Sequence, residues 1–558
     1  MSDDLQAHLD ALKAPRPTRA WRRRTLELLD DPAARDEVLH RVRRYATKDP
    51  NPVGGRPFSD ASLRNDPGAR GRVWAAALLG DPGTIPLLDV IVRRAAGVTR
   101  DFEPSARLAG AAVNALAEFS DPHALDVLRG LRRDVRYPGL GAQIGTAVET
   151  AAARRGITPA QLVERGVPRH GLCRDGSLAL DIGAYQAVLV IEDPLTVRLT
   201  FTGADGRPMR TVPGALKVPF AERIKELKIL VKRVRATLAA ERVRVEALMA
   251  VERVWTYGEW CRHYRDHPVT GVVASGLIWE FEGPDGSWHA ATPCEDVLVT
   301  VDGRAHPVPA GDARVRLWHP ARAVPGAVRA WRAFVADNRM TQPFRQAFRE
   351  TYRHAPAESS GSLACGCFDG EVSRVFAEGR WRVRCHHDAG HGRGEVRFDR
   401  RVAGRWRETA PADVPPLVFS EGTRESDLFI RVASIADESP FGELSATAEI
   451  RGDALRRVLP HTRIADRCAI DGRFLVVRGE LRDYKIHLGS GGVLMEPGEA
   501  SLRVEPSRKL GMRGLFVPFE DEHLTRIVGT AFLLAADHRI TDETVLRQIR
   551  PRLSPAVS

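Results

Sequence analysis

The chain has 558 residues, of which 43% are hydrophobic and 28% are charged, and its formal net charge is +11. This length exceeds what one hydrophobic core supports, so the sequence predicts several domains. No run of about eighteen apolar residues occurs, which excludes membrane-spanning helices, and no signal peptide is visible at the start. The seven cysteines form no regular framework, which predicts a reducing, cytoplasmic setting.

Residues 1–166 are typical of helical repeats. Three segments share a helix end, an Asp-Pro pair and a second helix, at Asp31-Pro32, Asp81-Pro82 and Asp121-Pro122. Each aspartate is a suitable N-cap, and each proline suits the first helical position, where an N–H would have no helical partner. The last two copies lie forty residues apart, close to the HEAT and armadillo period. We therefore predict a HEAT/armadillo-like α-solenoid, a scaffold that commonly binds protein partners.

Alternating strands mixed with helices follow, which predicts an α+β domain over 167–350. A long amphipathic helix is expected over 220–254, and a second helix over 340–353 with Pro343 near its start. The long helix has a basic face which, like the net charge, is compatible with a nucleic-acid partner. Glutamates interleaved at pairing distance favour a solvated helix face instead, so nucleic acid is not the favoured partner.

Cysteines and histidines gather between residues 365 and 391, in the sequences CGC and CHHDAGH. Thiolates and imidazoles at this density could bind zinc, and the candidate ligands are Cys365, Cys367, Cys385 and His387. However, Cys-x-Cys is rarer than Cys-x-x-Cys, and adjacent histidines on a strand point to opposite faces. Incidental histidines beside a strand are therefore the favoured interpretation. No cofactor is predicted, and zinc is the weaker alternative.

A second α+β part is predicted over 351–465. Within it, Ser420 with Glu421, Arg424 and Glu425 precedes an apolar stretch, and Asp427 ends this charged segment. The arrangement fits either a helix cap or a polar ligand site. The sequence leaves both interpretations open.

The stretch 473–497 predicts a β-hairpin closed by a Gly-Ser-Gly-Gly turn, within a C-terminal domain of hairpin and helices over 466–558. Its polar residues make it a candidate site, with His487 as a base and Glu496 as an acid or ribose ligand. The turn amides could hold a phosphate. The further candidates are Ser490 and Lys485 for catalysis and Tyr484 for ligand binding. Because the turn joins strand to strand, unlike a P-loop or a Rossmann loop, a purely structural hairpin is favoured.

Five segments in a fixed order carry a family resemblance: IKELKILVKRVRATLAAERVRVEALM, LWHPARAVPGAVRAWR, QPFRQAFRETY, DVPPLVFSEGTRESDLFIRVASI and YKIHLGSGGVLMEP. From about residue 166 to the end, the chain resembles MolR-like bacterial proteins of domain-of-unknown-function family 4132, including the closing domain. The resemblance implies a cytoplasmic protein with no established activity. Some members carry a DNA-associated WGR domain, but the sequence shows no counterpart of it.

These observations predict a cytoplasmic regulatory or scaffold protein that binds protein partners through its helical repeats. One alternative is an enzyme that binds a nucleotide or phosphate ligand at 484–497. The second alternative is a nucleic-acid-associated regulator. The sequence contains no complete catalytic signature, so enzymatic activity stays open, and no membrane partner is expected.

Overall fold

The computed structural model divides into two compact units, Met1–Pro168 and Arg169–Ser558. Each unit has its own hydrophobic core, and the chain is a mixed α+β protein, as predicted. The residues that the structure describes are 2–46, 66–97, 105–135, 138–154, 156–203, 206–353, 370–388, 393–433, 446–504, 516–519 and 521–549. The predicted zinc ligands Cys365 and Cys367 lie outside these ranges.

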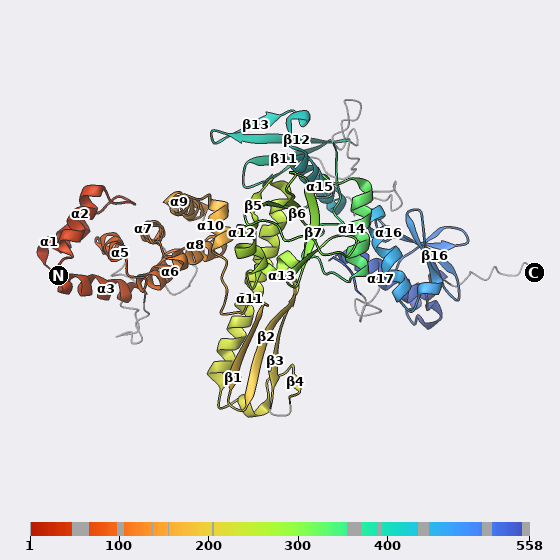
Figure 1. Ribbon diagram of the computed structural model, residues 1–558, viewed down its shortest axis with the longest axis horizontal. Coiled ribbons are helices and arrows are strands. Elements are labelled where there is room, and N and C mark those ends of the chain that lie inside the picture. The colour runs from red at the N-terminus through yellow and green to blue at the C-terminus, as the bar shows by residue number, and fades with distance from the viewer. Residues whose placement is uncertain are drawn as a thin grey trace, which may run out of the picture. The chain divides into compact units, whose positions relative to one another are not determined.

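The described part of the first unit is helical (Figure 1). Its helices are α1 (Asp3–Asp10), α2 (Arg19–Leu28), α3 (Pro32–Ala46), α5 (Ala69–Leu78), α6 (Thr84–Ala95), α7 (Ala106–Leu116), α8 (Pro122–Asp134), α9 (Pro138–Arg154) and α10 (Pro159–Arg165). Alternate helices contact one another, with α7 against both α5 and α9, and α6 against both α3 and α8. The alanine-rich α7 is buried over most of its surface because small side chains allow close helix approach. The solenoid interpretation stays a prediction.

The Asp-Pro pairs begin helices in two of the three predicted places. The carboxylate of Asp121 accepts a hydrogen bond from the N–H of His123 at 2.7 Å, and α8 begins directly after it. Asp31 accepts one from the N–H of Ala33 at 3.0 Å, and α3 begins in the same way. Asp81 instead closes a turn, and α6 begins only after that turn.

The second unit begins with an antiparallel meander of β1 (Ser177–Ile182), β2 (Tyr185–Asp193), β3 (Thr196–Thr202) and β4 (Pro208–Met209). Helix α11 (Ala221–Ala247) contacts β3 and runs along this sheet (Figure 1). The predicted helix end at residue 254 is wrong. A short 3-10 turn follows α11, and β5 (Val254–Thr256) then pairs with β9 (Arg314–Leu317).

The central sheet has the order β5-β9-β6-β7-β8 and is antiparallel. Its other strands are β6 (Trp279–Glu282), β7 (Trp288–Cys294) and β8 (Val297–Val299), and α12 (Tyr257–Trp260) and α13 (Thr270–Ser275) precede β6. The ring of Trp279 lies 5.8 Å from that of Trp255, 5.5 Å from Trp260 and 5.3 Å from Tyr264. These edge-to-face contacts join four fully buried aromatic side chains into one cluster of the core.

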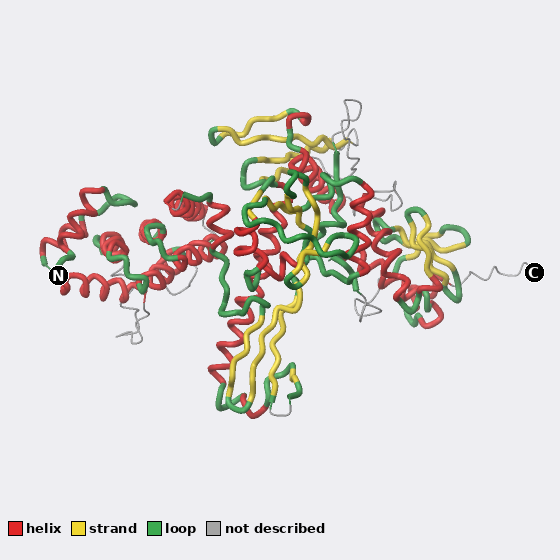
Figure 2. Tube along the Cα trace, viewed as in Figure 1, coloured by secondary structure: helices red, strands yellow, loops and turns green. Residues whose placement is uncertain are grey.

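Two further antiparallel sheets complete the unit (Figure 2). The first contains β10 (Gly370–Phe376), β11 (Trp381–Asp388), β12 (Arg393–Val402) and β13 (Arg405–Thr409), and α15 (Pro416–Ala433) contacts it. The second contains β14 (Cys468–Asp471), β15 (Phe474–Arg478), β16 (Asp483–His487), β17 (Val493–Glu496) and β18 (Ala500–Leu502). The remaining helices are α14 (Pro325–Asp337), α16 (Ala446–Val458), α17 (Glu522–Leu534) and α18 (Glu543–Ile549). One core cluster joins Ile278 and Trp318 to Tyr484 and Leu524, so the central and last sheets share a core.

Among the described residues, no helix is both long enough and apolar enough to cross a bilayer.

Replacing Trp279 with alanine should lower the free energy of unfolding by about 3–5 kcal/mol, because it empties the centre of the aromatic cluster. Trp288→Ala is the matched control, since this residue of the neighbouring strand is half-buried. Urea unfolding followed by far-ultraviolet circular dichroism measures both. Equal losses in the two variants would contradict the assigned core.

Candidate functional site

The segment 340–353 forms no helix, so the prediction of a second helix there is wrong. The side-chain amide of Gln346 accepts a hydrogen bond from the N–H of Ile278 at 2.8 Å. The same amide donates to the carbonyls of Ile278 at 2.8 Å and Trp318 at 2.9 Å. Gln342 accepts a bond from the N–H of Ala347 at 3.0 Å. The bonds of Gln346 to Ile278 and Trp318 take the place of helical hydrogen bonds and fix the segment against the interior, where its charged residues Arg349 and Glu350 are buried.

Arg349, one of these charged residues, lies at the centre of a buried ion cluster. Its guanidinium donates two hydrogen bonds to the carboxylate of Glu421 on α15, at 2.7 and 2.6 Å, and a third to Glu246 on α11 at 3.0 Å. Arg349 is 2% exposed and Glu421 is 4% exposed. His319, which is 1% exposed, lies 3.0 Å from the same carboxylate through Nε2. A buried carboxylate is thus matched by a bidentate arginine and an imidazole.

The proton positions in this cluster follow from its hydrogen bonds. The Nδ1 of His319 accepts a bond from the N–H of Ala321 at 3.0 Å, so Nε2 carries the proton and donates it to Glu421. Burial lowers the pKa of His319, which keeps the ring neutral. Burial alone would raise the pKa of Glu421, but the charge of Arg349 and the bonds from Arg349 and His319 lower it below its usual range. The buried Glu421 carboxylate is therefore held between the Arg349 cation, which also pairs with Glu246, and the neutral His319 donor.

Glu350 continues the charged chain from the next position in the sequence. Its carboxylate accepts hydrogen bonds from Arg424 at 2.9 Å, from Arg345 at 3.0 Å and from the hydroxyl of Thr447 at 3.3 Å. Burial alone would raise its pKa, yet the charges of Arg424 and Arg345 lower it. Glu350 thereby joins α15 to the start of α16.

Asp521 ends the chain of ion pairs at the N-terminus of α17. It pairs with Arg345 at 2.8 Å and accepts two bonds from Arg451 on α16, at 2.8 and 3.2 Å. Arg451 also donates to the carbonyls of Leu488 at 2.9 Å and Gly489 at 2.6 Å, in the hairpin turn. We call the residues Glu246, His319, Arg345, Arg349, Glu350, Glu421, Arg424, Arg451 and Asp521 the buried ion network.

The network shows what the predicted site around residue 420 does. The helix-cap interpretation is wrong, because α15 begins at Pro416 and the four residues lie inside it. Glu421 and Arg424 bind the network, and the hydroxyl of Ser420 accepts a bond from the N–H of Tyr352 at 3.1 Å. The side chain of Asp427 lies outside the described residues. The sequence therefore found real polar contacts, but their partners belong to the chain itself.

The predicted hairpin forms, and its candidate residues divide among three places. Lys485 pairs with Glu496 across the sheet, and Glu499 lies 3.5 Å from the same amine. The Nδ1 of His487 accepts a bond from the N–H of Ser490 at 3.1 Å, with the Ser490 hydroxyl at 3.0 Å. The lone pair that a general base needs is therefore already engaged in closing the turn.

Tyr484 lies on the opposite, buried face of this strand. Its hydroxyl donates a hydrogen bond to the carboxylate of Asp537 at 2.9 Å. The same carboxylate also accepts hydrogen bonds from the N–H groups of residues 480–482. This bond and burial raise the pKa of Tyr484 above its ordinary value, with burial as the larger cause. Tyr484 thus fixes a loop and is not available to a ligand.

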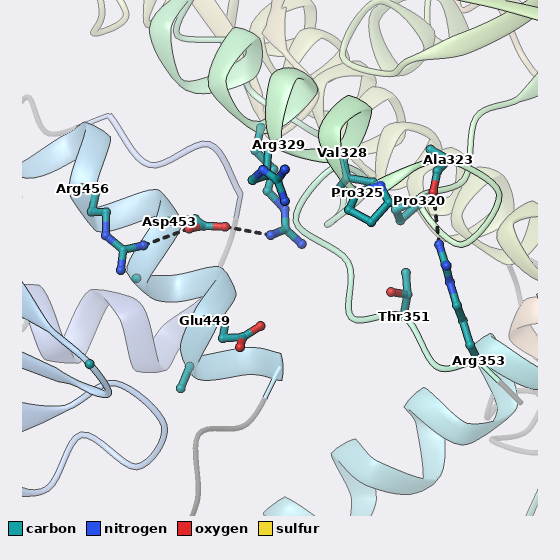
Figure 3. Close-up of a pocket in the computed structure, with 14 residues that line it drawn as sticks. Pro320, Ala323, Pro325, Val328, Arg329, Thr351, Arg353, Glu449, Asp453 and Arg456 are labelled. Carbon is teal, nitrogen blue, oxygen red and sulfur yellow. Dashed lines mark hydrogen bonds and ion pairs between the residues drawn. The ribbon is translucent and has the colours of Figure 1, made fainter. Parts of the chain in front are cut away.

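A cavity of about 530 Å³ lies beside the network (Figure 3). It is lined by Pro320, Ala323, Pro325, Val328, Arg329, Arg332, Thr351, Arg353, Ala448, Glu449, Gly452, Asp453, Arg456 and Gly472. Thr351 directly follows Glu350, and Ala448 directly follows Thr447, so the wall continues from the network. We call this cavity the α14/α16 pocket.

The α14/α16 pocket has more cationic than anionic side chains. Four arginines line it against the two carboxylates of Glu449 and Asp453. Asp453 binds Arg332 at 2.8 Å and Arg456 at 2.9 Å. Arg353 donates to the carbonyl of Ala323 at 3.2 Å. Arg329 is exposed and has no hydrogen bond or ion pair within the described part of the chain.

Sequence reasoning missed this pocket. Its only local signal is the spacing of charged residues three apart on two helices, at Arg329 with Arg332 and at Asp453 with Arg456. The same spacing occurs on any solvated helix face, so it identifies no site without the tertiary contacts.

Little of the predicted zinc cluster can be placed. Cys385 is buried in β11, where its strand neighbours are Val372 and Val396. The side chain of His387 lies outside the described residues. Among the residues that are described, no three potential ligands come together. The zinc site stays a prediction.

Comparisons with known proteins match this architecture to uncharacterised families. Residues 206–376 match the model of a domain of unknown function, DUF4132, and residues 448–549 match another, DUF7737. The predicted resemblance to family 4132 is thus confirmed for the first segment, while the link to MolR-like proteins stays a prediction. Both matched segments contribute residues to the α14/α16 pocket.

A curated relative is the uncharacterized protein YehI of Escherichia coli (strain K12), which is 25% identical over 266 residues. The match covers 45% of this chain and 21% of YehI, so the chain spans about a fifth of that relative. No solved structure matches the chain.

Removing one charge from the network should destabilise the second unit. Glu421→Gln leaves the Arg349 cation without its main counter-charge, which should lower the free energy of unfolding by about 3–5 kcal/mol. The matched control is Glu449→Gln, an exposed glutamate, for which a change within about 0.5 kcal/mol is expected. Urea unfolding followed by tryptophan fluorescence measures the difference. Similar midpoints for the two variants would contradict the assigned role of Glu421.

The network also predicts the acid limit of stability. The pKa values of Glu421, Glu350 and Asp521 are lowered in the folded state, where arginine charges outweigh the opposing effect of burial. Their stabilisation is therefore complete above the unfolded pKa of about 4 and is lost as the pH falls below it. The melting temperature of the wild type should fall steeply below about pH 4. Glu421→Gln should show a shallower fall, and an unchanged slope would exclude Glu421 as a contributor.

Proposed function

We propose that the second unit binds a small anionic ligand, bearing carboxylate or phosphate groups, in the α14/α16 pocket. The observation that carries this proposal is the excess of arginine over carboxylate in the lining, together with the exposed Arg329, which has no ion pair among the residues that the structure describes. Guanidinium groups match carboxylate and phosphate oxygens through pairs of parallel hydrogen bonds. An anion would supply the counter-charge that the lining itself does not.

The dimensions and composition of the pocket support the same proposal. A volume of about 530 Å³ lies within the range of about 300–1,000 Å³ that is typical of small-molecule sites. Pro320, Pro325 and Val328 supply an apolar wall on the side of α14. Apolar walls with a few oriented polar groups are the usual form of a ligand pocket.

Three of the four arginines, Arg332, Arg353 and Arg456, are held in place before any ligand arrives. Asp453 orients both Arg332 and Arg456, and Arg332 also donates to the carbonyl of Ala347 at 3.0 Å. Arg353 is held by the carbonyl of Ala323. Side chains fixed by such supporting bonds lose less conformational freedom on binding.

The lining favours binding over bond-breaking chemistry. Among the described residues that form the pocket, none is a histidine or a cysteine. Arginine stays protonated in proteins, so it can orient and neutralise an anion but cannot act as a base. The regulatory or scaffold function predicted from the repeats stays a prediction beside this binding proposal.

Titration calorimetry with citrate and with inorganic pyrophosphate tests the proposal and separates carboxylate from phosphate recognition. Arg329→Gln should weaken binding about 10-fold or more, because a hydrogen bond to a charged group contributes about 1.5–3 kcal/mol. The control is Arg457→Gln, which makes the same charge change on α16 at an exposed residue outside the pocket. An equal effect of both variants, or no binding of either anion at millimolar concentration, would contradict the proposal.

A further inference from the structure

A second concave surface lies at the start of α11 and is lined by cations. Its cavity of about 730 Å³ is formed by Arg210, Thr211, Val212, Lys217, Ala221, Ile224, Lys225, Lys228, Ile229 and Lys232. Five of these ten residues are basic and none is acidic. The start of α11 and strand β4 lie at the same end of the β1–β4 sheet (Figure 1). We call this surface the α11 groove.

The glutamates of α11 neutralise little of this charge. Glu222 pairs with Lys225 at 3.3 Å, and Glu226 pairs with Arg223, which lies outside the groove, at 2.8 Å. The other four cations of the groove have no ion pair within the described ranges, and they are Arg210, Lys217, Lys228 and Lys232. In the sequence, glutamates at pairing distance from the basic residues favour a solvated helix face. In this groove most of the cations are not paired with those glutamates.

We propose that the α11 groove binds the phosphate backbone of double-stranded nucleic acid, without reading its bases. Lys225, Lys228 and Lys232 lie one turn apart along one side of α11, and the seven residue steps from the first to the last cover about 10 Å of helix axis. A duplex carries one negative charge per about 1.7 Å of its axis, so phosphates are dense enough to lie within reach of each lysine of this row. Lys217 and Arg210 extend the basic surface to the preceding loop and β4.

The residue types distinguish a duplex from the other polyanions. Single-stranded binders use aromatic side chains on which bases stack, and none of the described lining residues is aromatic. Four of the five cations here are lysines, which place separate point charges along the helix and do not form the paired hydrogen bonds by which an arginine fork holds one carboxylate or phosphate group. Lysine is a point charge that suits phosphate oxygens in any orientation. The chemistry thus favours sequence-independent contact with a duplex backbone.

Fluorescence anisotropy with a labelled duplex of arbitrary sequence tests the proposal on the full chain. Four or five phosphate contacts predict a loss of affinity of about 100-fold or more between 50 and 200 mM salt. The triple variant Lys217→Gln, Lys228→Gln, Lys232→Gln should bind at least about 10-fold more weakly at 50 mM salt and should lower the salt slope by about three. A charge-reversed version with glutamate should abolish binding.

The control variant changes the same net charge elsewhere, through Arg400→Gln, Arg478→Gln and Arg503→Gln at exposed residues outside the groove. Circular dichroism and melting temperature confirm that each variant is folded, and exposed lysines on a helix face tolerate glutamine. Retained affinity in the control supports the groove as the site. Equal weakening in the control and groove variants, absence of duplex binding at 50 mM salt, or stronger binding of a single strand or of polyglutamate would each overturn the proposal.

Discussion

The contact between Arg349 and Glu421 is the interaction on which the second unit depends most. Both side chains are almost fully buried, and the segment that carries Arg349 is irregular and forms no helix. A buried ion pair adds little net stability because desolvation offsets most of the attraction. Its main effect is on specificity, since any other arrangement of the segment would leave a charge buried without a partner. The pair therefore selects one position of the 340–353 segment against α15.

The same logic extends along the network to α16. Arg451 on one side of this helix holds the hairpin turn and Asp521, and Asp453 and Arg456 on another side line the α14/α16 pocket. Helix α16 is thus fixed by buried charge where it meets the hairpin and presents oriented charge where it meets the pocket. The charged residues of the network are buried and paired with other residues of the chain. Those of the pocket are more exposed, and the chain supplies only part of their counter-charge.

Sequence patterns predicted the elements that depend on local rules. The strands and turn of the 473–497 hairpin, the N-cap at Asp121 and the start of the long helix follow from residues within one or two turns of each other. The prediction of a helix over 340–353 failed because the side chain of Gln346 bonds to Ile278 and Trp318, which lie 68 and 28 residues away in the sequence. A helical spacing of apolar and charged residues does not produce a helix when distant groups offer the backbone and side chains better hydrogen-bond partners.

The candidate sites show the same division. Glu421 and Arg424 are candidate ligand-binding residues by their chemical type. Only the fold shows that Glu421 is already paired with Arg349, 72 residues away, and Arg424 with Glu350, 74 residues away.

Paired and unpaired cations therefore carry different meanings in this protein. Of its 83 lysines and arginines, those in the network are matched by buried carboxylates and define the packing. Arg329 in the pocket and Lys228 in the groove lack such partners among the described residues. The two surfaces also differ in chemistry, because guanidinium groups that converge on one cavity suit a small anion, whereas a row of lysines along a helix suits an extended one. The net charge of +11 is thus not spread evenly over the surface. Part of it is concentrated at two concave surfaces whose shapes suit different anions.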